Sequence, residues 1–414
     1  MSVRELLLAA FHAALRAVDA RVCLPPFLPV APAGRTLVVG GGKAAAAMAA
    51  AVEAHWPAGA PLSGRVVTRY RHGLPTQRIE VVEASHPLPD GRGAAAAEAM
   101  LADLAQLGAD DLLLVLLSGG GSSLLALPVA GVSLKELRAV TRGLLASGAP
   151  IAAINTVRRH LTRFSGGRVA AASAAPVVGL LLSDVVGDAL EAIASGPTAP
   201  DSTSYSDALA ALDQFRVAAP DAVRAHLERG AAGGIVDTPA PGDPCFARVA
   251  NHLIGGARQA LAAAQAELEA RGVTVFNLGE IEGDAIAVAR EHAALIRSRL
   301  ADTPRPFALV SGGETTVEVA PDGGRGGRNT TYLLALGLAL AGVDHCHALA
   351  CDSDGIDGTE DNAGGLWAPM SLRADAAEHL ARRDAYAYFE AGGDLVVTGP
   401  TRTNVNDLRM VVLA

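Results

Sequence analysis

The sequence predicts an α/β protein made of two α/β domains. Short apolar runs near residues 37, 66, 80, 113 and 178 alternate with alanine-rich stretches such as 44–54 and 93–107. This alternation of strand-like and helix-like segments predicts a mostly parallel sheet with helices on both faces. The length of 414 residues is enough for two or three domains with a large buried core.

The N-terminal segment predicts an amphipathic helix. Apolar residues recur at steps of three and four from Leu8 to Val18, as one face of a helix requires. A signal peptide is the alternative, but His12, Arg16 and Asp19 interrupt its apolar run. We therefore expect this segment to be part of the folded protein.

A change in composition marks the best domain boundary. Residues 237–244 are rich in Pro, Gly and Asp, which is typical of a linker. We predict an N-terminal α/β domain over residues 1–238 and a C-terminal α/β domain over residues 239–414, with the last strand either in its own domain or packed back on the first. The second domain is expected to contain helices over 251–271 and 284–300, and strands over 273–276 and near 308, 317, 347 and 395. The crevice between the domains is then the default active site.

The overall composition argues against several classes of protein. The net charge of −9, the 4% aromatic content and the lack of a basic run disfavour a nucleic-acid partner. The uncharged stretch 112–134 contains three consecutive glycines and Pro128, so it fits strand, loop and helix better than a membrane helix. The four cysteines lack the paired spacing of a zinc or redox site, which predicts reduced thiols in a cytoplasmic protein. A metal site at residues 345–351 is disfavoured, because adjacent residues on a strand point to opposite faces.

The buried-strand pattern of residues 112–117 ends in a loop of glycines and hydroxyls. This loop comprises Ser118, Gly119, Gly120, Gly121, Ser122 and Ser123. Glycines let backbone N–H groups approach a phosphate or carboxylate, and the N-terminus of a following helix adds a favourable dipole. The alternative is an ordinary tight turn between a strand and a helix.

Similar breaks follow other apolar runs. Residues 36–39 lead into Gly40, Gly41, Gly42 and Lys43, and residues 307–310 lead into Ser311, Gly312, Gly313, Glu314 and Thr315. Two further runs end on the carboxylates of Asp184 and Asp352. In an open parallel sheet such strand ends line up along one edge, where ligands bind. The five breaks together predict a phosphate-handling enzyme.

The glycines of residues 40–43 resemble two nucleotide-binding signatures without matching either fully. A P-loop would need a glycine at position 37 and a hydroxyl residue at position 44, and both are missing. Gly40, Gly42 and Ala45 have the spacing of a dinucleotide fingerprint, but the next strand leads to Arg69 and Arg71 instead of an acid. An enzyme that uses NADP stays open, because arginines can bind its 2′-phosphate.

Charged residues next to these loops are candidates for the chemistry. Lys43 lies at a predicted helix start, where the dipole disfavours a cation unless the lysine serves an anion. Arg328 follows a glycine-rich loop and is a candidate to neutralise a transferring phosphoryl group, with a mobile hairpin that carries solvated arginines as the alternative. Asp184 and Asp188 are candidates for base or metal work, with helix N-capping as the alternative. The acidic stretch 352–361 does not match an EF-hand, so it is expected to bind Mg²⁺ or to face solvent.

An ordered series of motifs resembles one enzyme family. The chain resembles the glycerate kinases that join an N-terminal glycerate-kinase-like domain to a C-terminal MOFRL domain. The matching stretches are residues 39–44, 85–90, 118–124, 154–161, 183–188, 194–198, 311–316, 327–329, 354–358 and 399–407. They extend over nearly the whole chain, and the departures, such as Arg159 where lysine is frequent, are minor.

The resemblance implies ATP-dependent phosphorylation of D-glycerate, most often to 2-phosphoglycerate, with Mg²⁺ and a cleft between two α/β domains, the first of them Rossmann-like. Lys43 and Arg328 are expected to stabilise the transferring group, Asp184 to orient or deprotonate the hydroxyl, and Asp188 or Asp354 to assist the metal. Binding residues are expected among Gly41, Gly42, Ser118 to Ser123, Asn155, Arg158 and Ser311 to Thr315. Which loop holds glycerate and which holds ATP stays open, as does a homodimer.

Two other functions stay open. Relatives have often carried the label hydroxypyruvate reductase, so an NADP-dependent hydroxypyruvate reductase or glycerate dehydrogenase is the alternative enzyme. A non-catalytic binding protein for small acids is a third class.

Overall fold

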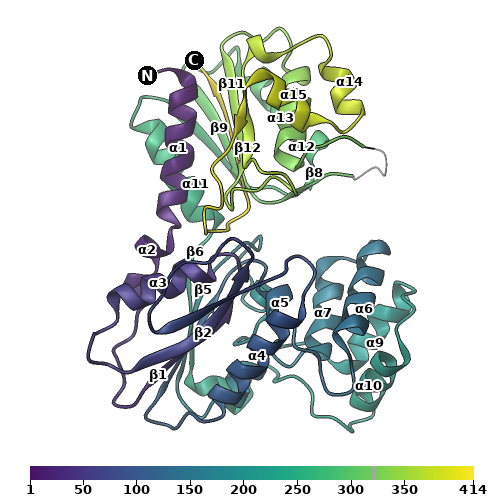
Figure 1. Cartoon of the computed structure of the whole chain (residues 1–414). Coiled ribbons are helices and arrows are strands. Elements are labelled where there is room, and N and C mark those ends of the chain that lie inside the picture. The colour runs from purple at the N-terminus through teal and green to yellow at the C-terminus, as the bar shows by residue number, and fades with distance from the viewer. Residues whose placement is uncertain (319–322) are drawn as a thin grey trace. The chain divides into compact units, whose positions relative to one another are not determined.

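The computed structural model describes residues 1–318 and 323–414, which form two compact units (Figure 1). The N-terminal unit comprises Cys23–Ile254, and the C-terminal unit unites Met1–Val22 with Gly255–Ala414. These limits differ from the boundary at residue 238 expected from the sequence, for two reasons. The strand β6 (Val249–Gly255) belongs to the first sheet, and the N-terminal helix α1 (Val3–Ala17) packs on α11 (Ala257–Glu269) through an apolar face that includes Leu7 and Phe11.

The N-terminal unit is built on a six-stranded sheet in the order β3-β2-β1-β4-β5-β6. Its other strands are β1 (Thr36–Gly41), β2 (Leu62–Arg69), β3 (Ile79–Ala84), β4 (Leu112–Leu117) and β5 (Val177–Leu182). The pairings of β1 with β2 and β4, of β2 with β3 and of β4 with β5 are all parallel. The prediction of a mostly parallel, Rossmann-like sheet is therefore confirmed.

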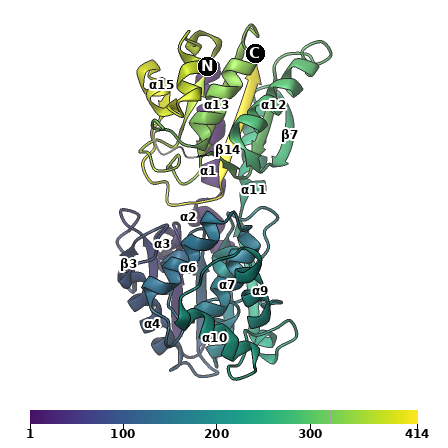
Figure 2. The same cartoon turned by 90° about the vertical axis from the view of Figure 1, so that its right-hand side faces the viewer.

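Helices cover this sheet on both faces, with α3 (Ala45–His55) and α4 (Gly91–Leu104) on opposite sides (Figure 1). On one face of the sheet, apolar residues of α4 pack in one core with Val39, Val67 and Val115. A group of helices not foreseen from the sequence forms its own core beside the sheet (Figure 2). It comprises α6 (Leu134–Ala146), α7 (Ile151–Leu161), α9 (Tyr205–Gln214) and α10 (Asp221–Ala231). Shorter elements are α2 (Ala20–Cys23), α5 (Gly121–Leu124), α8 (Arg168–Ala172), η1 (Pro25–Phe27), η2 (Ile193–Ser195) and η3 (Pro244–Arg248).

The C-terminal unit contains a mixed sheet in the order β13-β12-β11-β14-β9-β7. Its strands are β7 (Thr274–Glu280), β9 (Phe307–Gly312), β11 (Cys346–Asp352), β12 (Gly364–Trp367), β13 (Leu395–Val396) and β14 (Asp407–Leu413). The last strand, β14, runs antiparallel between β11 and β9, so it belongs to this sheet. The carboxyl ends of β9 and β11 therefore lie at the same edge as the start of β14.

Helices also flank the second sheet, with α1 and α11 on one side and α12 (Ala285–Arg299), α13 (Arg328–Ala339) and α15 (Ala385–Gly392) on the other (Figure 1). Its remaining elements are β8 (Gly283–Asp284), β10 (Thr315–Thr316), α14 (Ala376–Ala381) and η4 (Pro369–Ser371). The predicted helix over 251–271 is wrong in its first part, because residues 251–255 belong to β6 and Gly256 separates this strand from α11. Nowhere in residues 1–318 or 323–414 is there a helix whose length and apolarity would suit a membrane span. None of the four buried cysteines forms a disulfide.

Candidate active site

The strand order of the N-terminal unit defines where a ligand is expected. The chain moves outward from β1 to β2 and β3 and then returns to the other side of β1 with β4, so the order reverses between β1 and β4. Ligands of open α/β sheets bind at such a switch point, outside the carboxyl ends of the strands. In this register Gly41 at the end of β1 lies beside Leu117 at the end of β4. The loops that carry Lys43 and residues 118–123 therefore meet at the predicted edge, and Asp184 follows the next strand, β5.

The backbone amides of the turn after β1, residues 42–44, donate hydrogen bonds to neighbouring segments of the fold. The N–H of Lys43 donates to the carbonyl of Gly119 at 2.8 Å, and the N–H of Ala44 donates to Oγ of Ser118 at 3.0 Å. The N–H of Gly42 donates to the carbonyl of Val67. These amides are consequently used within the fold. The amides of Lys43 and Ala44 hold this turn against the glycine-serine loop.

The glycine-serine loop, residues 118–123, keeps donors for an anion. Among residues 1–318 and 323–414, no hydrogen bond from the N–H of Gly119, Gly120 or Ser122 is found. Gly120 has φ of +82°, and a Cβ there would lie 2.9 Å from the His86 ring and 3.5 Å from Cγ of Lys43. Gly120 is therefore required, because the Lys43 and His86 side chains lie against its backbone.

The helix expected after this loop is much shorter than the sequence suggested. α5 has only four residues, so its dipole contributes little to anion binding. The groups of this region that are chemically suited to an anion are instead the amides of the loop and Lys43.

A chain of polar side chains connects the glycine-serine loop to α7. Oγ of Ser122 lies 2.7 Å from Oγ of Ser195, which donates to Oδ1 of Asn155 at 3.5 Å. Ala194 and Ser195 both have left-handed backbone, with φ of +51° and +60°. Such strain in residues with side chains is concentrated at functional sites. Asn155 was among the expected binding residues, whereas no role was expected for Ser195, although it lies in the family motif at residues 194–198.

Arg158 lies one turn after Asn155 on α7 and is half-buried. Burial lowers its pKa to about 10. The neighbouring Arg159 is buried and pairs with Asp201 at 3.3 Å, which gives it a structural role.

Asp184 and Asp188 lie in the segment after β5, and both are half-buried. Asp188 has a left-handed backbone, with φ of +58°, and its N–H donates to the carbonyl of Val185 at 2.9 Å. Neither residue caps a helix, because the helices of this region begin elsewhere. The N-cap alternative is therefore wrong.

Arg328 is held by carboxylates in the C-terminal unit. Its guanidinium contacts Glu314 at 2.5 Å, Asp352 at 2.7 Å and Asp407 at 2.8 Å, and we call these four residues the Arg328 cluster. Although burial lowers the pKa of Arg328, the three carboxylates raise it well above its usual range. The loop was also open to interpretation as a hairpin with solvated arginines. For Arg328 that alternative is wrong.

Asp407 connects the cluster to the sheet. Its fully buried carboxylate accepts from Arg328, from Nδ2 of Asn329 at 2.8 Å, from the N–H of Thr315 at 3.3 Å and from Arg409 at 3.2 Å. Asp407 lies in the family motif at residues 399–407, but no role was expected for it from the sequence. One feature of the sequence could have identified Asp407. It is an aspartate at the first position of a strand whose other residues are mostly apolar.

A second buried carboxylate caps α13. Asp357 accepts from the N–H of Asn329 at 2.9 Å, the N–H of Thr330 at 2.9 Å and Oγ1 of Thr330 at 2.8 Å. Burial raises the pKa of Asp357 to about 6. Asp354 is also buried, and its Oδ1 accepts from the N–H of Ile356 at 2.8 Å. Asp357 therefore has a role in holding the helix that carries Arg328.

The magnesium ligands proposed from the sequence belong to different units, Asp188 to the N-terminal and Asp354 to the C-terminal unit. In the described part of the chain, no group of three or more His, Cys, Asp or Glu side chains is placed to hold a metal ion. Magnesium at nucleotide sites is commonly held by one or two carboxylates together with phosphates. The donor chemistry of each aspartate fits that mode of binding.

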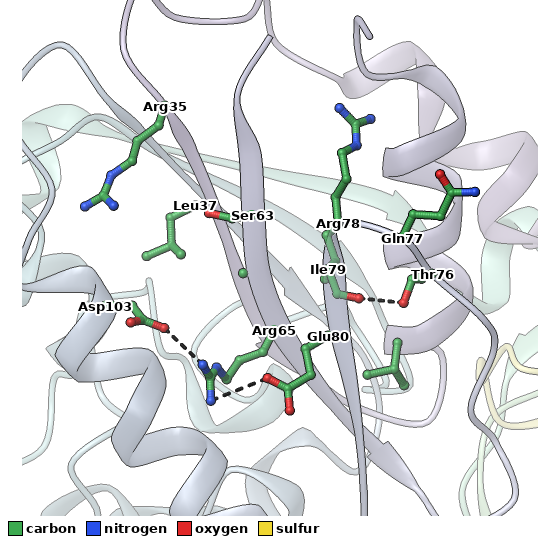
Figure 3. A pocket seen from close by; sticks show the side chains of 12 residues that line it. Arg35, Leu37, Ser63, Arg65, Thr76, Gln77, Arg78, Ile79, Glu80 and Asp103 are labelled. Atoms are coloured by element: carbon green, nitrogen blue, oxygen red, sulfur yellow. Dashed lines mark hydrogen bonds and ion pairs between the residues drawn. The ribbon is translucent and has the colours of Figure 1, made fainter. Parts of the chain in front are cut away.

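A cavity of about 520 Å³ lies elsewhere, at the amino ends of β1, β2 and β3 (Figure 3). Arg65 on its wall is paired with Asp103 at 3.4 Å and Glu80 at 3.6 Å. Arg35 and Arg78 point in different directions, away from Arg65 (Figure 3). The cavity contains none of the residues predicted for the active site.

Comparisons with known proteins extend over the whole chain. The family described as "Domain of unknown function (DUF4147)" matches residues 6–228, and the MOFRL family matches residues 307–407. A D-glycerate 2-kinase from Thermotoga maritima is 37% identical over 98% of this chain and 97% of its own. A protein from Agrobacterium vitis, provisionally named a hydroxypyruvate reductase, is 45% identical over 100% of this chain and 95% of its own. The crystal structure of a glycerate kinase from Thermotoga maritima matches with a TM-score of 0.88 and 35% identity, over 100% of both chains.

Proposed function

The chain belongs to the glycerate kinase family that joins a DUF4147 domain to a MOFRL domain, and we propose that it transfers the γ-phosphoryl group of ATP to the 2-hydroxyl of D-glycerate. Family membership supports glycerate phosphorylation. The ATP dependence, the 2-position, the metal and the residue roles are our proposal.

The observation that carries this proposal is the arrangement of the switch point. Lys43 lies against Gly120, beside amides of the glycine-serine loop that donate to no group in the described residues. An ammonium and fixed N–H donors in one place suit phosphate oxygens, whose charge they offset. Because these donors are preorganised by the hydrogen bonds of Lys43 and Ala44, they are suited to stabilise charge that develops during phosphoryl transfer.

The acceptor hydroxyl needs a group to orient it and to take its proton. We assign this role to Asp184, because β5 is adjacent to β4 and the segment after it starts at the same edge as the glycine-serine loop. In-line transfer would then use Lys43 to stabilise the transferring group and Asp184 to direct the hydroxyl.

The role proposed for Arg328 must account for its three carboxylate partners. A guanidinium has five N–H groups, and the three ion pairs leave two of them for a phosphoryl oxygen. Because the carboxylates exceed the arginine in charge, the cluster is suited to a phosphate that is accompanied by a cation. This supports a magnesium-bound nucleotide better than a bare phosphate.

We propose that Asp188 or Asp354 holds Mg²⁺. When bound, the ion would neutralise charge on the phosphate oxygens. We also propose a cytoplasmic location, which the reduced, buried cysteines support. A homodimer is a further proposal, which size-exclusion chromatography with light scattering tests.

One experiment tests the proposed function. The protein is incubated with D-glycerate, ATP and Mg²⁺, and the product is identified by ³¹P and ¹³C NMR. We expect 2-phosphoglycerate and ADP. Formation of 3-phosphoglycerate would overturn the proposed position of transfer.

Two further measurements distinguish the reductase and the binding protein from the kinase. Oxidation of NADPH by hydroxypyruvate without ATP, together with no phosphoglycerate, would establish the reductase. Binding of glycerate with no release of ADP would establish a binding protein.

A further inference from the structure

Arg158 differs from Arg159 and Arg163, which are near it in the sequence, because no counter-ion is found for it in the described residues. Arg159 pairs with Asp201 at 3.3 Å, and Arg163 pairs with Glu98 at 3.5 Å. For the guanidinium of Arg158, no ion pair or hydrogen bond is found within residues 1–318 and 323–414. Its pKa is lowered to about 10 by burial alone. Because a half-buried charge without a partner loses part of its hydration, a bound anion would offset that cost.

The surroundings of Arg158 are rich in hydrogen-bonding groups. Asn155 precedes it by three residues on α7, so the two side chains lie on the same face of the helix. Asn155 is buried, its Oδ1 accepts from Ser195, and no hydrogen bond from its Nδ2 is found in the described part of the chain. Ser195 in turn contacts Ser122 of the glycine-serine loop at 2.7 Å. This series of polar side chains therefore extends from Asn155, on the same helix face as Arg158, to Ser122 at the switch point.

The backbone at Ser195 supports a functional role for this chain of residues. Ala194, Ser195 and Gly196 have consecutive φ values of +51°, +60° and +61°. A Cβ at Gly121 would lie 2.7 Å from Cβ of Ala194, so this turn packs directly on the loop. Two residues with side chains are thus held in a sparsely populated conformation that points Ser195 at Ser122.

We infer that Arg158, with Asn155 and Ser195, binds the carboxylate of the acceptor, which makes the acceptor a short hydroxy acid and excludes neutral polyols. A guanidinium binds a carboxylate through two parallel hydrogen bonds, and the amide and hydroxyl supply further donors. The side chain of Lys43 and the amides of Gly119 and Gly120 are then left to bind phosphate. The inference rests on the proposed function for the identity of the acceptor, and it divides the site into a carboxylate side and a phosphate side.

The test compares Arg158→Gln with the matched control Arg163→Gln, whose side chain is 46% exposed and pairs at the surface. Initial rates are measured with D-glycerate and with D-glyceramide, its neutral analogue. Since hydrogen bonds to charged groups contribute about 1.5–3 kcal/mol, we expect Arg158→Gln to raise KM for glycerate roughly 10- to 150-fold. The preference for glycerate over glyceramide should fall by the same factor. KM for ATP should stay unchanged, and the control should behave like the wild type.

Other outcomes would overturn the inference. A rise in KM for ATP with glycerate unaffected would place the nucleotide at Arg158. A lower Tm with unchanged KM values would show a structural role, whereas removal of an unpaired charge should leave Tm unchanged or raise it.

Calorimetric titration of D-glycerate without ATP separates this inference from the proposed function. Binding that is lost in Arg158→Gln supports the carboxylate site even if the wild type forms no phosphoglycerate. Equal binding to both proteins refutes it even if the kinase activity is established.

Discussion

Replacing Asp407 with asparagine is expected to destabilise the C-terminal unit strongly. The carboxylate is fully buried between the guanidinium groups of Arg328 and Arg409 and also accepts from Asn329 and Thr315. In Asp407→Asn the amide oxygen can still accept on one side, but the amide nitrogen then faces two donors on the other. Both arginines also lose the negative charge between them. Breaking a buried ion pair by removing one partner costs about 3–5 kcal/mol, which is the loss expected here.

The chain allows this loss to be measured in one unit at a time. It contains two tryptophans, Trp56 in the N-terminal unit and Trp367 in the C-terminal unit, and both are buried. In a Trp56→Phe background, urea unfolding followed by fluorescence reports on Trp367. The control is Asp375→Asn, in the same unit, whose carboxylate is 47% exposed and pairs with Arg373. Exposed pairs contribute about 0–1 kcal/mol, so Asp407→Asn with a loss below 1 kcal/mol, equal to the control, would refute the reasoning.

Two further predictions concern activity and pH. Lys43→Ala removes a preorganised donor, so kcat should fall about 10²- to 10³-fold in a coupled ADP assay; a near-normal kcat would contradict the assigned role. Burial lowers the pKa of His292 to about 4 from an unfolded value of 6.5, so the folded state keeps this imidazole neutral while the unfolded state takes up a proton. Stability should therefore fall by about 3 kcal/mol as pH drops from about 6.5 to about 4. In His292→Gln this part of the pH dependence should disappear when urea unfolding is repeated between pH 7 and pH 4, and equal slopes in both proteins would contradict it.

The sheet and one half of the candidate site could be predicted because they depend on local patterns. An apolar run followed by a loop identifies the end of a strand, and parallel strands bring such ends to one edge, so Lys43 and the glycine-serine loop were found together. The carboxylates around Arg328 could not be predicted in this way. Arg328 and Asp407 are 79 residues apart, and their contact depends on β14 being inserted antiparallel between β11 and β9. A sequence pattern shows that a segment is a strand, but it does not show which neighbours the strand will have.

The domain boundaries and the role of Arg158 could not be predicted from the sequence for the same reason. α1 has an apolar face that any partner could cover, and only the folded chain shows that α11 covers it. For Arg158, the resemblance to glycerate kinases implies a binding role but gives no reason for it. The reason that we propose is that no counter-ion is found for Arg158 in the described residues, which depends on the three-dimensional surroundings of the side chain.

The strand order of the N-terminal unit is that of a dinucleotide-binding fold, yet its glycines are used differently. In a dinucleotide fingerprint the second glycine leaves room for the pyrophosphate to approach the backbone. Here a Cβ at Gly42 would lie 2.1 Å from Oγ of Ser118, and one at Gly40 would lie 1.9 Å from the carbonyl oxygen of Leu116. The space beside both glycines, where a ligand would approach, is therefore filled by the neighbouring strand and its loop. The amides of Gly42 and Lys43 also donate to carbonyl groups of the protein. The amides for which no hydrogen bond is found in the described residues lie after β4, so we propose that phosphate binds there, and this arrangement favours the kinase over an NADP-dependent reductase.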